Sequence, residues 1–206
     1  MQVPNQDTIK LVIPRFDIKP LVEPVKQLQT LINASDPHID EIARVINQQE
    51  GLSNAILTVV NSPFYQNKEP LEDVATIANK LGLNTLFGFC SAALFTQQYA
   101  NSNNDLVKAL CSDSVDIANA MLFISKKTKS DIPSSILYTI GAFHNCGMFL
   151  LAQKYDDYEA VLKEAMLNRD NSVRLEQQHY GIEHPTLAYI TAALWNIPAN
   201  MCQLIL

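Results

Sequence analysis

The stretch Gly141-Ala142-Phe143-His144-Asn145-Cys146-Gly147 lies in the middle of an apolar run with helical spacing, and this run indicates the fold class. On either side of it, apolar side chains recur every three or four residues, as they do along one face of a helix. The spacing predicts a helix over residues 133–153, with Pro133 in its first turn. His144 falls on the apolar stripe, and Asn145 lies about 100° further round the helix.

Helical spacing continues outward from this stretch along nearly the whole chain, and no segment alternates apolar and polar residues as a half-buried strand would. Gly51, Pro63 and Gly82 separate the first helical segments, because glycine and proline interrupt a helix. The predicted helices cover residues 39–46, 52–60, 71–81, 83–99, 105–127, 133–153, 157–167, 172–179 and 185–195, with a last one from 198. The sequence therefore predicts an all-α, multi-helix bundle.

The composition fits a folded domain in a reducing compartment. Of the 206 residues, 48% are hydrophobic and 17% are charged, which is enough apolar material for a core. The four cysteines stand far apart and form no Cys-x-x-Cys pair, so we expect them to be reduced. The first ten residues are too polar for a secretory signal, and no apolar run approaches the roughly 20 residues that cross a bilayer. We expect a cytoplasmic protein without a membrane partner.

The charge argues against nucleic-acid binding. A formal charge of −6 works against it, because affinity for a phosphate backbone comes largely from lysine and arginine. The basic segment Lys126-Lys127-Thr128-Lys129 is typical of a solvated helix end, where cations offset the helix dipole. A local basic face formed by Arg15, Lys19 and Lys26 stays an open alternative.

The organisation of the chain suggests one domain over residues 13–206 that begins with a helical subdomain. Asn101-Ser102-Asn103-Asn104 breaks the helical pattern and is the candidate internal boundary. The chain ends in the apolar run Met201-Cys202-Gln203-Leu204-Ile205-Leu206. We therefore expect either a truncated chain or a last helix that a partner chain completes, so oligomerisation stays open.

Two polar residues on apolar helix faces, Asp113 and His144, form the first candidate site. In the segment 105–127, Asp113 and Ser114 stand where the apolar stripe should continue. The members of that stripe are Leu106, Leu110, Ile117, Met121 and Ile124. Asp113 and His144 would then both face inward, where an unpaired carboxylate is costly. They could hydrogen-bond to each other in the core, which we favour, or hold a metal or a small anion. Because metal sites need three or more good ligands, and His144 is the only undoubted one, we expect no bound metal.

His184 is the second candidate. It stands immediately before Pro185 at a predicted helix start, which favours a capping or packing role and leaves ligand or partner binding as the alternative. Cys146 is two residues from His144, so the two side chains point apart on a helix, and the histidine cannot easily activate the thiol. The residues therefore suggest no catalytic nucleophile.

Taken in order, these segments resemble the HDOD domain, the HD-related output domain of bacterial signalling proteins. The resemblance covers about residues 13–206. It rests on Ile13-Pro14-Arg15-Phe16, Asn61-Ser62-Pro63-Phe64, Leu81-Gly82, the stretch around His144, Glu176 to Gly181, and His184-Pro185. It implies an HD-like helical bundle and a role in signal transduction.

The chain departs from the metal-binding pattern of HD phosphohydrolases. Those enzymes carry His-Asp where this chain has His144-Asn145, and a neutral amide is a poorer metal ligand than a carboxylate. Asp113 falls about where their first histidine ligand stands. The resemblance therefore implies a vestigial HD site of Asp113, His144 and Asn145 with no catalytic residue, metal or cofactor. We expect a regulatory module that binds a signalling protein or a small signalling ligand; the alternative is a metal-dependent phosphohydrolase with an altered ligand set.

Overall fold

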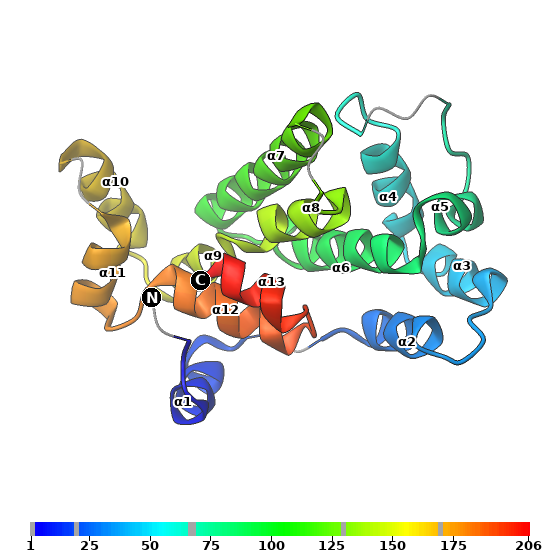
Figure 1. The fold of residues 1–206 in the computed structure, drawn as a ribbon. Helices are drawn as coiled ribbons and strands as arrows, with labels where there is room; N and C mark the ends of the chain where they lie inside the picture. Colours follow the sequence, from blue (N-terminus) through cyan, green and yellow to red (C-terminus); the bar gives the residue numbers. More distant parts are fainter. Residues whose placement is uncertain (1–2, 19–20, 66–68, 129–130, 169–170) are drawn as a thin grey trace. The chain divides into compact units, whose positions relative to one another are not determined.

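The computed structural model describes residues 3–18, 21–65, 69–128, 131–168 and 171–206. In these ranges the regular structure is helical and no strand occurs, which confirms the predicted all-α class (Figure 1). The chain divides into two compact units. The first contains Met1–Pro20, Gln98–Val115 and Ala142–Leu206, and the second contains Leu21–Gln97 and Asp116–Gly141. The segment Asn101 to Asn104 thus lies inside the first unit.

The second unit is built from the early helices of the chain together with later segments. Its helices are α2 (Glu23–Ile32), α3 (Ile39–Asn47), α4 (Leu52–Val60), α5 (Val74–Leu81), most of α6 (Leu83–Ala100), the later part of α7 (Asp105–Thr128) and most of α8 (Ser134–Phe143). Within it, α3 packs on both α2 and α5. A Cβ added to Gly141 would lie 2.6 Å from the Cα of Ala118, so α8 and α7 approach closely here.

Side-chain hydrogen bonds fix two places in the second unit, the start of α5 and the backbone at Leu71. The α5 helix begins at Val74 because Asp73 caps it, with Oδ1 accepting from the Thr76 backbone N–H at 2.6 Å. The Asn61 side chain holds the following loop at Leu71, since its amide nitrogen donates to the Leu71 carbonyl and its oxygen accepts from the Leu71 N–H, both at 2.8 Å. The Asn-Ser signature therefore has a structural role.

The first unit is centred on two helices that pack along each other, α9 (Cys146–Lys154) and α12 (His184–Leu194). A Cβ on Gly147 would overlap the backbone carbonyl of His184, so only glycine allows this approach. Around this pair lie α1 (Gln6–Phe16), α10 (Tyr158–Asn168), α11 (Ser172–Tyr180) and α13 (Ala199–Ile205). The indole of Trp195 is fully buried and meets the ring of Phe143 edge-on, with the two centroids 6.1 Å apart.

The single helix predicted over residues 133–153 is wrong. The α8 helix ends at Phe143, His144 and Asn145 form a turn, and α9 begins at Cys146. Apolar spacing did not reveal the turn, because both helices bury apolar residues on either side of it. After the turn, α9 begins at Cys146 and packs against α12 at Gly147.

The expectation that no apolar run reaches bilayer length is also wrong. The stretch Ser134–Lys154 is long and apolar enough to cross a membrane by length and composition. However, 72% of its most apolar window is buried within the fold, as in the core helix of a water-soluble domain.

The α7 helix turns a different face inward from the one predicted. Its buried residues are Val107, Cys111, Ser114, Ala118, Leu122 and Ser125. This face lies about 100° round the helix from the larger apolar residues that the sequence analysis placed inside. Small side chains face inward where α8 comes close at Gly141, and Ile117 and Ile124 are left exposed.

Candidate functional site

The most polar part of the core lies in the first unit around Glu176. This α11 residue is completely buried, and both of its carboxylate oxygens accept hydrogen bonds. The Oε1 atom accepts from the hydroxyl of Tyr158 at 2.7 Å, and Oε2 accepts from the backbone N–H of His184 at 2.8 Å. The Nδ1 atom of His184 lies 2.7 Å from Oε2 and 2.9 Å from Oε1. Because a carboxylate only accepts, Nδ1 carries a proton.

Local sequence places these groups together. The α11 helix ends at Gly181, which adopts a left-handed conformation with φ of 69°. The chain then turns back, and because His184 is the first residue of α12, its backbone N–H has no acceptor inside that helix. Glu176 accepts this N–H and puts negative charge at the positive end of the helix dipole. The His184 ring is buried against Glu176, as a packing role requires, whereas the N-cap residue of α12 is Glu183 and no side chain caps that helix.

Tyr158 takes part as a neutral donor. Burial, and next the charge of Glu176, raise the pKa of the Tyr158 phenol well above its ordinary value. The phenol therefore stays protonated and donates to the carboxylate at all physiological pH values.

A tyrosine stack connects α1 to the end of α11. The rings of Tyr155 and Tyr180 stack with centroids 4.2 Å apart, and the Tyr180 hydroxyl donates to Asp157 at 3.1 Å. One guanidinium nitrogen of Arg15 contacts the Tyr155 hydroxyl at 2.8 Å and the Tyr180 carbonyl at 2.6 Å. Arg15, which belongs to the N-terminal signature, thus fastens α1 to this end of the unit.

A groove of about 530 Å³ lies beside this junction, wholly within the first unit. We call it the N-terminal groove; its lining includes Val3, Thr8, Leu11, Arg15, Gln177, Ile182, Glu183 and Thr186. Leu11 is 74% exposed, although it is a large apolar side chain. Glu183 and Thr186 flank the buried His184-Pro185 step, and the Thr186 hydroxyl donates to Glu183 at 2.7 Å. The lining thus mixes apolar, polar and charged groups.

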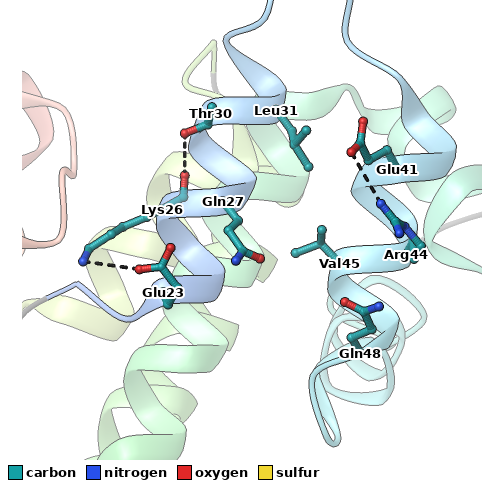
Figure 2. A pocket seen from close by; sticks show the side chains of 9 residues that line it. All are labelled: Glu23, Lys26, Gln27, Thr30, Leu31, Glu41, Arg44, Val45 and Gln48. Carbon is teal, nitrogen blue, oxygen red and sulfur yellow. Dashed lines mark hydrogen bonds and ion pairs between the residues drawn. The ribbon is translucent and has the colours of Figure 1, made fainter.

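A second cavity, of about 360 Å³, lies between α2 and α3 in the second unit (Figure 2). Its charges pair within each helix, Lys26 with Glu23 at 3.5 Å and Arg44 with Glu41 at 3.4 Å. These pairs are exposed, and such surface pairs contribute little energy. Because the charges do not converge on one point, the arrangement does not favour a specific ligand.

The residues of the predicted HD site occupy different environments. Asp113 is exposed on α7, so the prediction that it faces the core is wrong, and Ser114 takes the buried position instead. His144 and Asn145 are half-buried in the turn between α8 and α9. The hydrogen bond proposed between Asp113 and His144 stays a prediction.

Sequence reasoning missed the role of Glu176, although the residue lies in one of the recognised segments. Its neighbours along α11 are polar, and no spacing rule links a glutamate to a His-Pro step further along the chain. Within the ranges that the structure covers, no three His, Cys, Asp or Glu side chains gather closely enough to hold a metal ion.

Comparison with known proteins agrees with this architecture. A family model of the HDOD domain matches residues 18–206. No curated protein matches the chain. The fold is similar to that of an HDOD domain protein of unknown function from Geobacter sulfurreducens. The TM-score is 0.70 at 19% identity, over 98% of this chain and 70% of that one.

Two further crystal structures share the fold. One, from Shewanella amazonensis SB2B, is provisionally named a phosphohydrolase. Its TM-score is 0.69 at 15% identity, over 94% of this chain and 70% of that one. The other, from Marinobacter aquaeolei VT8, is provisionally named a signal transduction protein. Its TM-score is 0.60 at 16% identity, over 94% of this chain and 44% of that one. At these identities the likeness concerns the fold, whereas the family model covers most of the sequence, so the chain belongs to the HDOD family.

Proposed function

We propose that this chain is a non-catalytic signal-transduction module that binds a partner protein or a small signalling ligand in the N-terminal groove. The observation that carries the proposal is that the buried His184 imidazole and Glu176 carboxylate are hydrogen-bonded to each other inside the fold. Tyr158, the His184 ring and the His184 N–H occupy both oxygens of Glu176, whose side chain has no exposed surface. A general base must reach its substrate, which this carboxylate cannot do in the folded state.

The turn that carries His144 supports the same proposal. Beside the imidazole stands Asn145, whose amide is neutral and a weaker ligand than the aspartate of HD enzymes. Asp113, the other member of the expected set, is exposed on α7. These three side chains would supply one imidazole and one carboxylate, fewer ligands than catalytic metal sites use.

The N-terminal groove supplies a surface for binding. Its volume falls within the roughly 300–1,000 Å³ common for ligand sites. Leu11 offers an apolar anchor, and Gln177, Glu183 and Thr186 offer hydrogen-bonding groups. Arg15 lines the groove while it also holds Tyr155 and Tyr180, so a ligand that contacts Arg15 would be sensed at the end of α11.

The catalytic alternative is tested with protein purified without chelator. Its content of Mn, Fe and Zn is measured, and hydrolysis of phosphodiester and nucleotide substrates is compared with that of His144→Ala. We expect no stoichiometric metal and no turnover above the level of the variant. Metal-dependent hydrolysis that His144→Ala abolishes would overturn the proposal and establish a phosphohydrolase.

The binding surface is tested with Leu11→Glu, which places a charge in the groove. The matched control is Leu167→Glu, because Leu167 is also highly exposed but lies on α10, outside the groove lining. Each protein is used to capture partners from the native cell and is screened against a nucleotide panel by thermal shift. We expect a partner or ligand that the wild type and Leu167→Glu retain and that Leu11→Glu loses. Equal recovery by all three proteins would exclude the groove.

A further inference from the structure

The outward face of α7 in the second unit is apolar in its middle. Ile117, Phe123 and Ile124 are 36%, 37% and 56% exposed, and Ala120 is also exposed. On the opposite side, Ala118 and Leu122 are fully buried. The helix therefore has a conventional core-facing side and a second side that is apolar without being covered.

An aromatic pair widens this exposed patch. The ring of Phe64, which follows α4, is 43% exposed and meets the Phe123 ring edge-on, with centroids 6.1 Å apart. The ammonium of Lys127 lies 5.4 Å from the centroid of the Phe123 ring. Exposed apolar side chains that are contiguous and edged by charge mark interaction sites on folded proteins.

Charges stand at both ends of the patch with opposite signs. At about 100° per residue, Asp116, Ala120, Phe123 and Lys127 fall within about 60° of one another on the helix surface. Asp116 and Lys127 are both exposed and lie three turns apart, about 16 Å along the axis. The face thus runs from an acid through a small and a large apolar residue to a base.

This order is self-complementary. If a second copy of the helix is laid antiparallel about a two-fold axis midway between Met121 and Leu122, each Asp116 meets the second copy's Lys127. The same axis places each Ala120 opposite the second copy's Phe123, so the large ring meets the smallest side chain on the face. One symmetry operation therefore satisfies the charge pattern and the size pattern together.

We propose that the α7 face formed by Asp116, Ile117, Ala120, Phe123, Ile124 and Lys127 is the docking site of a second copy of this chain, in an antiparallel, two-fold arrangement. A parallel copy would place like charges side by side. An anionic membrane or a nucleic acid would be repelled by Asp116 and by the net charge of −6. The antiparallel copy pairs both charges, and the apolar residues in the middle of the face are then buried on both copies.

Charge exchange tests this arrangement. Asp116→Lys and Lys127→Asp each place like charges opposite one another at both ends of the interface, whereas the double variant restores opposite charges. Sedimentation equilibrium at low salt measures the dimer dissociation constant, and circular dichroism checks that each variant is folded. We expect each single variant to raise the dissociation constant by about tenfold or more, and the double variant to recover most of this loss.

The matched control for Asp116→Lys is Glu164→Lys, which makes the same change of net charge on an exposed position of α10. It should leave the dissociation constant within about twofold of wild type. A protein that stays monomeric at every concentration would overturn the proposal, and so would a dimer that the single variants do not weaken or the double variant does not restore. A monomer that binds phosphatidylserine vesicles, and loses this binding in Phe123→Ser, would assign the face to a membrane instead.

Discussion

Among single residues, Glu176 is a fully buried carboxylate in the first unit. Its carboxylate joins three elements, because Tyr158 belongs to α10, Glu176 to α11 and His184 to the start of α12. A buried charge is tolerated only where hydrogen bonds satisfy it, and here both oxygens are occupied. The same contacts that hold the helices together keep this carboxylate away from any substrate.

Replacing this carboxylate by an amide tests the role of Glu176. In Glu176→Gln, one acceptor becomes an NH₂ group that faces donors, so we expect a loss of about 1–3 kcal/mol in the free energy of unfolding. Urea unfolding measures the change. The control Glu164→Gln alters an exposed carboxylate on α10 and should change stability by less than about 0.5 kcal/mol. Equal stabilities of the two variants would contradict the role given to Glu176.

Buried tyrosines predict a loss of stability at alkaline pH. Burial raises the pKa of Tyr138 to about 12 from the ordinary value of 10.0. Between these values the unfolded chain releases the phenol proton while the folded chain keeps it, so the unfolded state binds fewer protons and stability falls as pH rises. Below pH 10 this contribution is fully present.

Tyr138→Phe checks this linkage, because phenylalanine has no proton to release. We expect the free energy of unfolding, followed by urea titration from pH 9 to pH 12, to fall less steeply in the variant. The difference in slope should approach about 1.4 kcal/mol per pH unit. Parallel curves for the two proteins would show that Tyr138 does not titrate differently in the folded and unfolded states.

Among the helices, the α9 and α12 pair forms the centre of the first unit, and its approach depends on one glycine. A side chain on Gly147 would overlap the backbone carbonyl of His184, which cannot move without shifting α12 and its hydrogen bond to Glu176. The turn at His144 and Asn145 serves the same contact, because it ends α8 and sets the start of α9. The conspicuous His-Asn-Cys-Gly stretch therefore has a packing role whatever its chemistry.

Gly147→Ala tests the closeness of this pair. We expect a loss of about 1–3 kcal/mol or more in the free energy of unfolding, because the added methyl group forces backbone shifts. Gly88→Ala is the control: a Cβ there would lie 3.0 Å from the Thr139 hydroxyl, a side-chain atom, and alanine favours the interior of α6. If thermal unfolding showed the two variants to be equally stable, the contact between α9 and α12 would be less close than described.

At the scale of the whole molecule, a binding module and a metal-dependent enzyme differ in the metal ligands that they need. The described residues offer a buried pair of Glu176 and His184 but no third ligand beside it. A cation that binds only the folded state stabilises it, by about 2.7 kcal/mol at a hundred times its dissociation constant.

Metal removal therefore provides a test on the whole protein. We expect the same thermal midpoint after dialysis against EDTA and after addition of Mn²⁺ or Zn²⁺. Differential scanning calorimetry measures the midpoint, and the His144→Ala variant is run in parallel. A midpoint that rises with added metal in the wild type, and does not rise in His144→Ala, would indicate a cation site at the turn and favour the phosphohydrolase alternative.

Much of the fold could be predicted because helical periodicity is a local property. The bounds of α4 agree with the predicted 52–60, and those of α3 differ from the predicted 39–46 by one residue. The face of α7 was predicted wrongly, since Ile117 and Ile124, two large apolar residues of the predicted stripe, lie outside, whereas Ser114 and Ala118 lie inside. Size and hydrophobicity indicate that a helix is amphipathic, but close packing at Gly141 decides which side faces inward.

By itself, the sequence determined the all-α class and the membership of the HDOD family, because both depend on the order and spacing of residues along the chain. Only the tertiary structure decided which polar residues are buried. Glu176 is inside, where donors from Tyr158 and His184 converge on its carboxylate, whereas Asp113 is exposed on α7, where water can solvate its carboxylate. The free energy of burying a charge depends on neighbours that folding brings together, and spacing along the chain does not contain that information.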